Sequence, residues 1–380
     1  MAHIRWGQAP KWALLLGGLA ISAAMTPVRA ADDRMHVHVI DVGAGDAILV
    51  EFPCAAILVD TGGERTPSKG LPVIYESEPG LLAYLDKFFA ARPDLKNTLA
   101  SLVISHPHLD HTRSVQAVLD RYKPRNIVYN GQVSDKDSGV AGQRAAIKYA
   151  NETPGVKTWF VLQRTIDAAK GLSNEIIDPV ACQGVDPQIR AMWGQVEDKQ
   201  GWLAEDFDDP NNHSVVLRID YGKSSILLTG DLEESHKANR KAGIERMIDF
   251  YQGTSLLDVD VYKVGHHGSH NATSPALVSA MSPKIAAMSS GPACKRSGYT
   301  AYQHGHPRTE TVNQLIAGVS GTRQPTTVLA FDKFEAPPSS VSLSKAVYST
   351  GWDGTFVLSA DRDGNWKVDS MLGAPACLKP

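Results

Sequence analysis

The segment that most constrains this chain is Ser105–His111, SHPHLDH, which directly follows the apolar run LASLVI. In an extended loop, the side chains of His106 and His108 point to the same side, so two imidazoles can converge on one ion. Asp110 and His111 follow a turn and can face a second ion beside the first. Imidazole and carboxylate groups are ligands of zinc, manganese and iron. The segment therefore predicts a metal site at the end of a strand.

Other predicted strands also end in residues that can bind metals. Asp60 follows AILV, Asp231 follows ILLTG, and the pair His266 and His267 follows VDVYKVG. An aspartate beside glycine is common in turns, so any one of them could be a turn residue. A surface loop with unrelated histidines is a poor alternative for SHPHLDH, because three of the 13 histidines follow one apolar strand there. Together these residues favour one site built from several strand ends.

Hydrophobic periodicity predicts alternating strands and helices. Apolar and alternating segments predict strands at 35–42, 46–52, 55–60, 99–105 and 125–131. Helical spacing predicts helices at 80–90 and 112–122, and regular alternation returns after residue 210. This pattern predicts an α/β fold in which two sheets pack together with helices outside. Residues 132–210 are less regular, and we expect them to be an insertion that shapes the mouth of the pocket.

The first thirty residues have the pattern of a secretory signal peptide. Arg5 and Lys11 precede the apolar run WALLLGGLAISAAM, and V-R-A at 28–30 resembles a cleavage site. The apolar run is short for a bilayer span, so we expect cleavage after Ala30 rather than a membrane anchor. The sequence thus predicts an exported protein, periplasmic or extracellular, in which residues 31–380 form a single domain without stable membrane insertion.

Charge and cysteine content limit the function further. Cleavage would remove three positive charges and no negative ones, which changes the net charge from −3 to −6. No Lys/Arg-rich block is present, so charge does not support a nucleic-acid partner. The four cysteines, Cys54, Cys182, Cys294 and Cys377, include no C-x-x-C pair, which argues against a thiolate zinc site or a redox motif. Export would allow one or two disulfides, and their pairing stays open, as does the oligomeric state.

The motifs LVDTGG, SHPHLDH and LLTGD together resemble those of the metallo-β-lactamase superfamily of metal-dependent hydrolases. More narrowly, NHSVVLRIDYGKSSILLTGDLEE, VDVYKVGHHGS and GHP at 305–307 are similar to the hydrolase domain of the ComEC/Rec2 competence proteins. The opening HVIDVGAGDAILVEF fits the same branch, and the resemblance covers about 36–131 and 212–370. It implies a four-layer αβ/βα sandwich of two mixed sheets flanked by helices, with metals at one sheet edge.

The resemblance implies roles for the residues of the first half. Asp60 would orient the histidine ligands and so support catalysis. His106 and His108 would hold the first metal. Asp110 and His111 would hold the second, and Asp110 would also take part in catalysis.

The resemblance also implies roles for residues of the second half. Asp231 would bridge both metals, and either His266 or His267 would complete the second ion. His213 stands where many members of the superfamily have a further ligand. In the competence branch this place is commonly Asn-x-x-Ser, which Asn211 and Ser214 match, so a ligand role for His213 stays open. His306, in GHP, is a candidate proton donor to the leaving group.

The leading interpretation is an exported hydrolase that uses two divalent metal ions, with zinc favoured over manganese or iron. A hydroxide between two cations about 4 Å apart, with its pKa lowered towards about 7, would attack a phosphodiester or a related ester of a small molecule. One alternative is a β-lactam, a lactone or a thioester as the substrate of the same site. The other is a non-catalytic binding protein that retains the fold.

Overall fold

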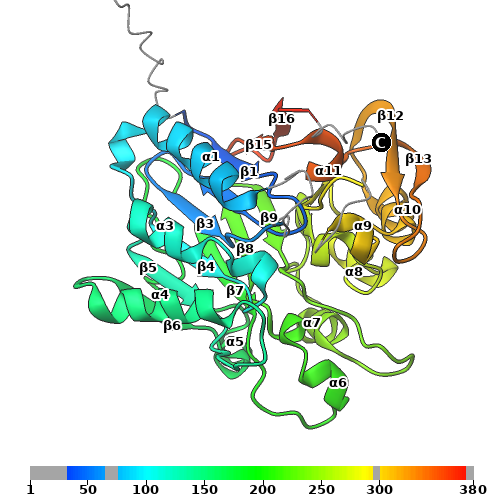
Figure 1. The fold of residues 1–380 in the computed structure, drawn as a ribbon, viewed down its shortest axis with the longest axis horizontal. Helices are drawn as coiled ribbons and strands as arrows, with labels where there is room; N and C mark the ends of the chain where they lie inside the picture. Colours follow the sequence, from blue (N-terminus) through cyan, green and yellow to red (C-terminus); the bar gives the residue numbers. More distant parts are fainter. Residues whose placement is uncertain (1–31, 65–75, 294–299, 374–380) are drawn as a thin grey trace, which may run out of the picture.

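The computed structural model describes residues 32–64, 76–293 and 300–373 (Figure 1). The predicted signal peptide at 1–30, and with it the cleavage site, lies outside the described residues, as do Cys294 and Cys377. Within the described ranges, no helix combines the length and the apolar sequence that a bilayer crossing would need.

The first sheet is mixed and has eight strands in the order β16-β15-β1-β2-β3-β4-β5-β6. Its antiparallel part runs from β16 to β3, and its parallel part runs from β3 to β6. The strands are β1 (Met35–Val39), β2 (Ile48–Glu51), β3 (Ala56–Val59), β4 (Ser101–Ile104), β5 (Asn126–Tyr129), β6 (Lys157–Phe160), β15 (Phe356–Ala360) and β16 (Trp366–Met371).

The second sheet is also mixed and has six strands in the order β14-β11-β10-β9-β8-β7. Strands β7, β8 and β9 are antiparallel, whereas β9, β10, β11 and β14 run parallel. The strands are β7 (Gln188–Trp193), β8 (Val216–Tyr221), β9 (Ser224–Leu228), β10 (Val261–Val264), β11 (Ile285–Met288) and β14 (Val347–Ser349). A separate hairpin is formed by β12 (Thr322–Ala330) and β13 (Ser339–Lys345).

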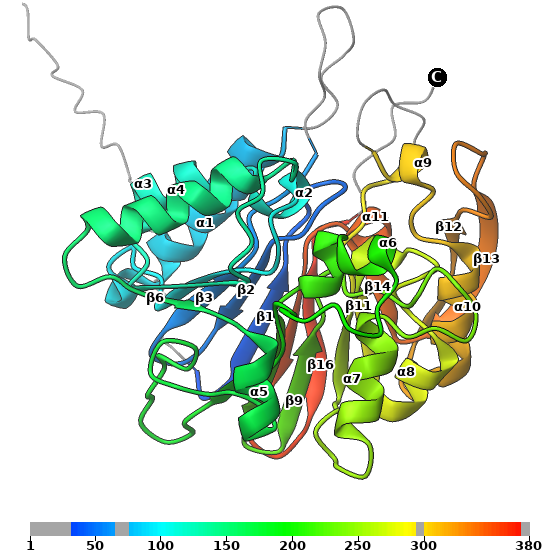
Figure 2. The ribbon, with the colours of Figure 1, turned by 90° about the horizontal axis from the view of Figure 1, so that it is seen from below.

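The two sheets face each other, and helices cover their outer faces (Figure 2). The period of two along a strand explains why: Ile48 and Val50 of β2 lie in the core between the sheets, whereas Leu49 packs in the core beneath the outer helices. The main outer helices are α1 (Ser77–Ala91), α3 (Val115–Tyr122) and α4 (Val140–Glu152) on the first sheet, and α7 (Gly243–Tyr251), α8 (Pro275–Met281) and α10 (Thr309–Gly318) on the second. The predicted four-layer sandwich is confirmed.

Short helices complete the fold. They are η1 (Pro93–Leu95), α2 (Leu109–Thr112), α5 (Gln163–Ala169), α6 (Ala204–Phe207), η2 (Pro210–His213), η3 (His266–Gly268), α9 (Ala301–His304) and α11 (Thr350–Asp353).

The segment 132–210 is built into both sheets. Its strand β6 extends the first sheet beside β5, and its strand β7 extends the second sheet beside β8. A disulfide between Cys54 and Cys182 ties the segment to the turn between β2 and β3. The strand β6 is partly exposed, which explains why its hydrophobic pattern is weak in the sequence.

Candidate metal centre

The polar residues that follow the strands meet where the two sheets adjoin. The loop after β4 carries His106 and His108 and leads into α2 with Asp110 and His111, whereas Asp231 follows β9 and His267 follows β10. Parallel neighbours end at the same edge of a sheet, which is why residues distant in sequence converge here. One ligand atom from each of four residues lies within 4.8 Å of the others, in the group Asp110, His111, Asp231 and His267.

Asp231 lies at the middle of this group. Its side chain is 1% exposed, and its Oδ2 atom lies 3.1 Å from Nε2 of His111 and 3.5 Å from Nε2 of His267. The same oxygen is 4.0 Å from Nε2 of His106. Nε2 of His106 in turn lies 3.0 Å from Nδ1 of His108. The arrangement therefore places Asp231 between two sets of imidazole nitrogens, which is the position that a bridging carboxylate needs.

The structure distinguishes the two adjacent histidines. His267 Nδ1 lies 3.0 Å from the carbonyl oxygen of Ser289, which leaves Nε2 facing Asp231 and lying 3.4 Å from Asp110 Oδ2. A ring whose second nitrogen contacts a backbone carbonyl is the usual state of a histidine ligand. His266 also has a partner on its second nitrogen, with Nδ1 2.7 Å from Oε1 of buried Glu233. Its Nε2, however, lies 3.9 Å from Asp231 Oδ2, and it does not belong to the group of four residues whose ligand atoms lie within 4.8 Å of one another. His267 is thus the better candidate ligand of the pair.

The backbone at this pair is unusual. His266 and His267 both have positive φ, 43° and 52°. Two consecutive residues with side chains seldom adopt this left-handed conformation, which costs of the order of 1 kcal/mol or more for each. The two ring planes are inclined at 72° to each other, and the strained backbone that sets this arrangement lies at the site itself.

Asp60 holds the first half of the site in place. Its Oδ1 accepts a hydrogen bond from the backbone N–H of Ser105 at 2.8 Å, and its Oδ2 accepts one from the Ser105 hydroxyl at 2.7 Å. Oδ2 is also 2.8 Å from His111 Nδ1. The Ser105 hydroxyl lies 3.1 Å from His106 Nδ1. Asp60 therefore contacts His111 directly and His106 through Ser105, as expected for a residue that orients ligands.

The buried carboxylates of the site favour positive charge beside them. Burial by itself lowers the pKa of His111, but the carboxylates of Asp231 and Asp60 outweigh it and raise this pKa well above its ordinary value. Burial raises the pKa of Asp231, and the neighbouring imidazoles, His111 first, outweigh that and hold it well below its ordinary value. The proton on His111 compensates a buried carboxylate as a metal ion would. Metal binding would displace it.

His213 is not placed among these ligands. Its Nδ1 accepts a hydrogen bond from the backbone N–H of Val196 at 3.0 Å, and its Nε2 lies 2.7 Å from the carbonyl oxygen of Phe207. Both ring nitrogens are therefore occupied by backbone groups, which argues against the ligand role that the sequence left open for His213. Ser214 faces the site instead, since its hydroxyl accepts from the Asp231 N–H at 3.1 Å and lies 3.4 Å from His106 Nδ1.

His306 lies beside the two adjacent histidines. It is buried, and its ring centroid is 5.3 Å from that of His266 and 6.4 Å from that of His267. Burial, and then the positive charges of His266 and His267, hold the pKa of His306 well below its ordinary value. An imidazole with a lowered pKa is largely unprotonated at neutral pH, which weakens the case for His306 as the proton donor.

Three further polar residues at the site were not predicted. Glu233 contacts His266 and accepts a hydrogen bond from the Asn211 side chain at 2.9 Å. Asp46 and Lys263 form a buried ion pair beneath the site. The signal for Glu233 was its place two residues after Asp231, and the signal for Lys263 was a charge inside an apolar strand.

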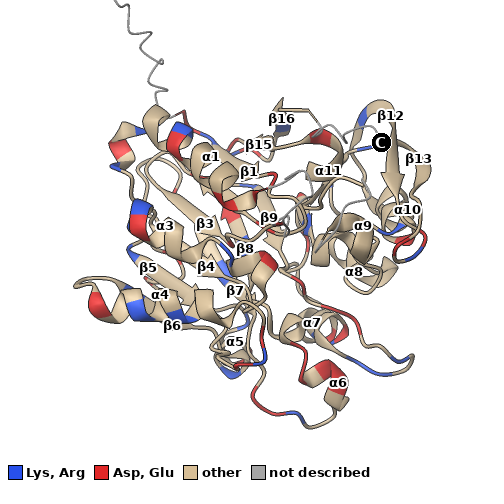
Figure 3. Cartoon of the chain, viewed as in Figure 1, with Lys and Arg blue, Asp and Glu red and all other residues tan. Residues whose placement is uncertain are grey.

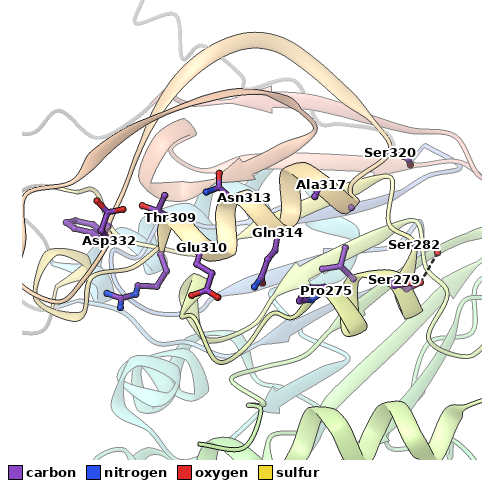
Figure 4. A pocket seen from close by; sticks show the side chains of 14 residues that line it. Pro275, Ser279, Ser282, Thr309, Glu310, Asn313, Gln314, Ala317, Ser320 and Asp332 are labelled. Carbon is purple, nitrogen blue, oxygen red and sulfur yellow. Dashed lines mark hydrogen bonds between the residues drawn. The ribbon is translucent and has the colours of Figure 1, made fainter. Parts of the chain in front are cut away.

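The site opens towards Asp110, whose side chain is 41% exposed. A separate cavity of about 1000 Å³ lies between α8 and α10 and includes no residue of the histidine and aspartate group (Figure 4). Arg308 lines one end of this cavity, and its backbone N–H donates to the carbonyl oxygen of Gly268, just after the paired histidines. The cavity is therefore a neighbour of the candidate metal centre, not the centre itself.

Comparisons with known proteins agree with this geometry. Residues 40–170 match the family model described as the metallo-beta-lactamase superfamily. Recombination protein 2 of Haemophilus influenzae is 41% identical over 262 residues, which are 67% of this chain and 24% of that protein. ComE operon protein 3 of Bacillus subtilis is 30% identical over 262 residues, 67% of this chain and 28% of that protein. Competence protein ComA of Neisseria gonorrhoeae is 26% identical over 313 residues, 82% of this chain and 35% of that protein.

This chain thus spans between a quarter and about a third of the length of these relatives. The matched family model covers the strands and loops that carry Asp60 and the SHPHLDH segment. Residues 40–170 therefore form a match to the metallo-β-lactamase superfamily, and the chain is similar to the ComEC/Rec2 competence proteins.

Proposed function

We propose that the protein is a hydrolase that uses two divalent metal ions. One observation carries the proposal: Asp231 Oδ2 lies within 4.0 Å of imidazole nitrogens on His106, His111 and His267, which reach it from both sheets. His106 and His108 would hold one ion, and Asp110, His111 and His267 the other, with Asp231 between them. Zinc suits this mixture of imidazole and carboxylate ligands, and manganese or iron would also fit it.

When bound, the ions would supply Lewis acidity and lower the pKa of a coordinated water molecule. The residues of the chain do the rest. Asp60 keeps the ring of His111 oriented. The 41% exposure of the Asp110 side chain marks the side from which substrate would enter.

His266 is better placed than His306 to give a proton to the leaving group. Burial by itself lowers the pKa of His266, but Asp231 and Glu233 outweigh it and raise this pKa to about 9. Its Nδ1 lies 2.7 Å from Oε1 of Glu233, and its Nε2 faces the site, 3.9 Å from Asp231 Oδ2. We therefore assign proton donation to His266. His306 would pack against the ring of His266 instead of donating a proton.

We favour a phosphodiester as the substrate bond, and the similarity to the competence proteins supports this choice. Lys and Arg are dispersed among Asp and Glu in the view of Figure 3, which favours a small ester over a long nucleic acid as the partner. A β-lactam, lactone or thioester substrate, or binding without catalysis, remains the alternative that the experiment below addresses.

We also propose that the protein is exported. The N-terminal pattern of charge and hydrophobicity supports this proposal. The disulfide between Cys54 and Cys182 supports it as well, because such bonds form and persist in oxidising compartments.

The test is metal content together with a substrate panel on one sample. The panel contains bis-(p-nitrophenyl) phosphate, linear DNA and nitrocefin, each assayed before and after treatment with a chelator, and Asp231→Ala serves as the inactive control. We expect about two metal ions per chain and diesterase activity that the chelator abolishes and zinc restores. A chain that takes up neither zinc nor manganese would rule the mechanism out. Hydrolysis of nitrocefin, without hydrolysis of the diester or DNA, would support a β-lactam as the substrate class in place of a phosphodiester.

A further inference from the structure

Lys263 is a charged residue inside a buried strand. It lies in β10, is 3% exposed, and has Val261, Tyr262 and Val264 as buried neighbours. Its Nζ atom lies 2.8 Å from Oδ1 and 3.0 Å from Oδ2 of Asp46, and it donates to the carbonyl oxygen of Val264 at 3.1 Å. Removing an ammonium and a carboxylate from water is costly, and a pair of apolar residues would fill the same space. Stability alone therefore does not explain why a buried ion pair occupies this place.

The two partners belong to different halves of the molecule. Asp46 lies two residues before β2 of the first sheet, whereas Lys263 is part of β10 in the second sheet. Asp46 also donates its backbone N–H to the carbonyl oxygen of Asp110 at 3.0 Å. Lys263 lies four residues before His267 on the same strand and turn. The ion pair thus joins the segment that supports Asp110 to the strand that carries His267.

The contacts around Asp110 leave its backbone little freedom. A Cβ atom added to Gly62 would lie 1.3 Å from the carbonyl oxygen of Asp110, and one added to Gly45 would lie 2.6 Å from it. Both glycines therefore let neighbouring segments press directly on the Asp110 peptide. Because these segments are in such close contact, a shift of Asp46 would be passed on to Asp110.

Asp46 is not itself a candidate metal ligand. Asp46 belongs to a second group with Asp60 and His111, in which one ligand atom of each residue lies within 4.8 Å of the others. Both of its oxygens contact the Lys263 ammonium, and Asp60 is already taken by Ser105 and His111. The cation of this second group is therefore Lys263.

We infer that the pair of Asp46 and Lys263 is a positioning pair that sets the distance between the two halves of the metal centre. The inference rests on the proposed function, since it concerns how the ligands of that site are held. The directed contacts of an ion pair fix the relative position of two groups, whereas apolar contact is non-directional. The pair touches neither metal nor substrate and acts through Asp110 on one side and His267 on the other.

The test separates positioning from stability. Lys263→Met and Asp46→Leu are made singly and together, and each protein is examined by urea unfolding without metal and by zinc competition against a chromogenic chelator. Each single variant leaves one buried charge unpaired and is expected to be less stable, and the double variant is expected to recover most of that loss. We expect the double variant to bind zinc at least tenfold more weakly than the wild type.

The matched control is the pair of Arg323 and Asp353, which is also largely buried but joins β12 to α11. Arg323→Met combined with Asp353→Leu should leave zinc affinity unchanged. Asp46→Asn keeps the side-chain size and one acceptor for Lys263, so an intermediate loss of affinity is expected.

Zinc affinity equal to that of the wild type in the folded double variant, or in folded Asp46→Asn, overturns the positioning role and leaves the proposed function intact. A wild-type chain that binds no zinc overturns the proposed function, and the positioning role with it. The two failures are therefore distinguishable by the wild-type measurement alone.

Discussion

His267 and Asp231 meet across the ends of the neighbouring strands β10 and β9, with 3.5 Å between Nε2 and Oδ2. His266, the residue just before, has Nδ1 2.7 Å from Oε1 of Glu233, and its Nε2 is farther from Asp231 Oδ2, at 3.9 Å. Two identical side chains at adjacent positions thus enter different environments, and the positive φ of both residues makes this separation possible.

This difference predicts different outcomes for the two alanine variants. His267→Ala should reduce the bound metal from about two ions to about one per chain, because a ligand is lost. His266→Ala should keep both ions and lower kcat about 10²–10⁴-fold, the usual contribution of a positioned proton donor. Metal analysis and steady-state kinetics on the two proteins measure both effects. The reverse pattern of metal loss would show that the assignment of the two residues is inverted.

Asp60→Asn should weaken metal binding without removing a ligand. An amide is a weaker partner for His111 than a carboxylate, and loss of such a contact typically lowers metal affinity about 10–100-fold. Competition with a chelator measures the affinity. Asp120→Asn on the exposed face of α3 is the control. Unchanged affinity in Asp60→Asn would show that His111 is oriented by other contacts.

His213→Ala should alter stability but not metal content. The substitution leaves the Val196 N–H and the Phe207 carbonyl without their partner, which costs about 1–3 kcal/mol for a buried group. Urea unfolding and metal analysis of the same preparation check both parts. A protein of normal stability that has lost an ion would restore His213 to the ligand set.

Glu51 should make stability depend on acidity far from the metal centre. Burial by itself raises its pKa, but hydrogen bonds and charge from His38 and then Arg92 outweigh it and lower the pKa to about 2, from an ordinary value of 4.5. Because the folded-state pKa is the lower one, the stabilisation is complete above about pH 5 and is lost as the pH falls towards 2. The shift corresponds to about 3 kcal/mol.

Urea unfolding of the wild type and Glu51→Gln between pH 6 and about pH 3 measures this contribution, since the lower limit must leave a folded protein. The glutamine variant should be less stable at pH 6 and should lose less stability on acidification. Parallel pH profiles for the two proteins would contradict the prediction.

The local motifs of this site were predictable because they are short and contiguous. Asp60 and SHPHLDH follow the parallel neighbours β3 and β4 of the first sheet, so strand order brings them to one edge, and Asp231 follows β9 of the second sheet, which packs against the first. The four-layer fold follows from the alternation of strands and helices. Successive side chains of a strand such as β2 point to opposite faces of the sheet, and because the first three of β2 are all apolar, a hydrophobic core forms on each face of the first sheet.

Other features depend on tertiary contacts that no local pattern encodes. Which of His266 and His267 comes closer to Asp231 depends on two φ angles and on the positions of Ser289 and Glu233. His213 has the residue type of a ligand, but its ring is turned towards Val196 and Phe207. The strand β7 was not predicted, because its sequence QIRAMW mixes polar and apolar residues without a regular alternation.

The disulfide and the metal centre lie at opposite ends of one strand. Cys54 precedes β3 and Asp60 follows it, so roughly 13 Å of strand separates the bonded sulfurs from the residues that orient the ligands. Thiolates are strong zinc ligands, and a reduced Cys54 or Cys182 would compete for the ion during maturation. Once these two sulfurs are joined they no longer compete, so oxidation and metal loading become chemically independent steps in the assembly of the mature protein.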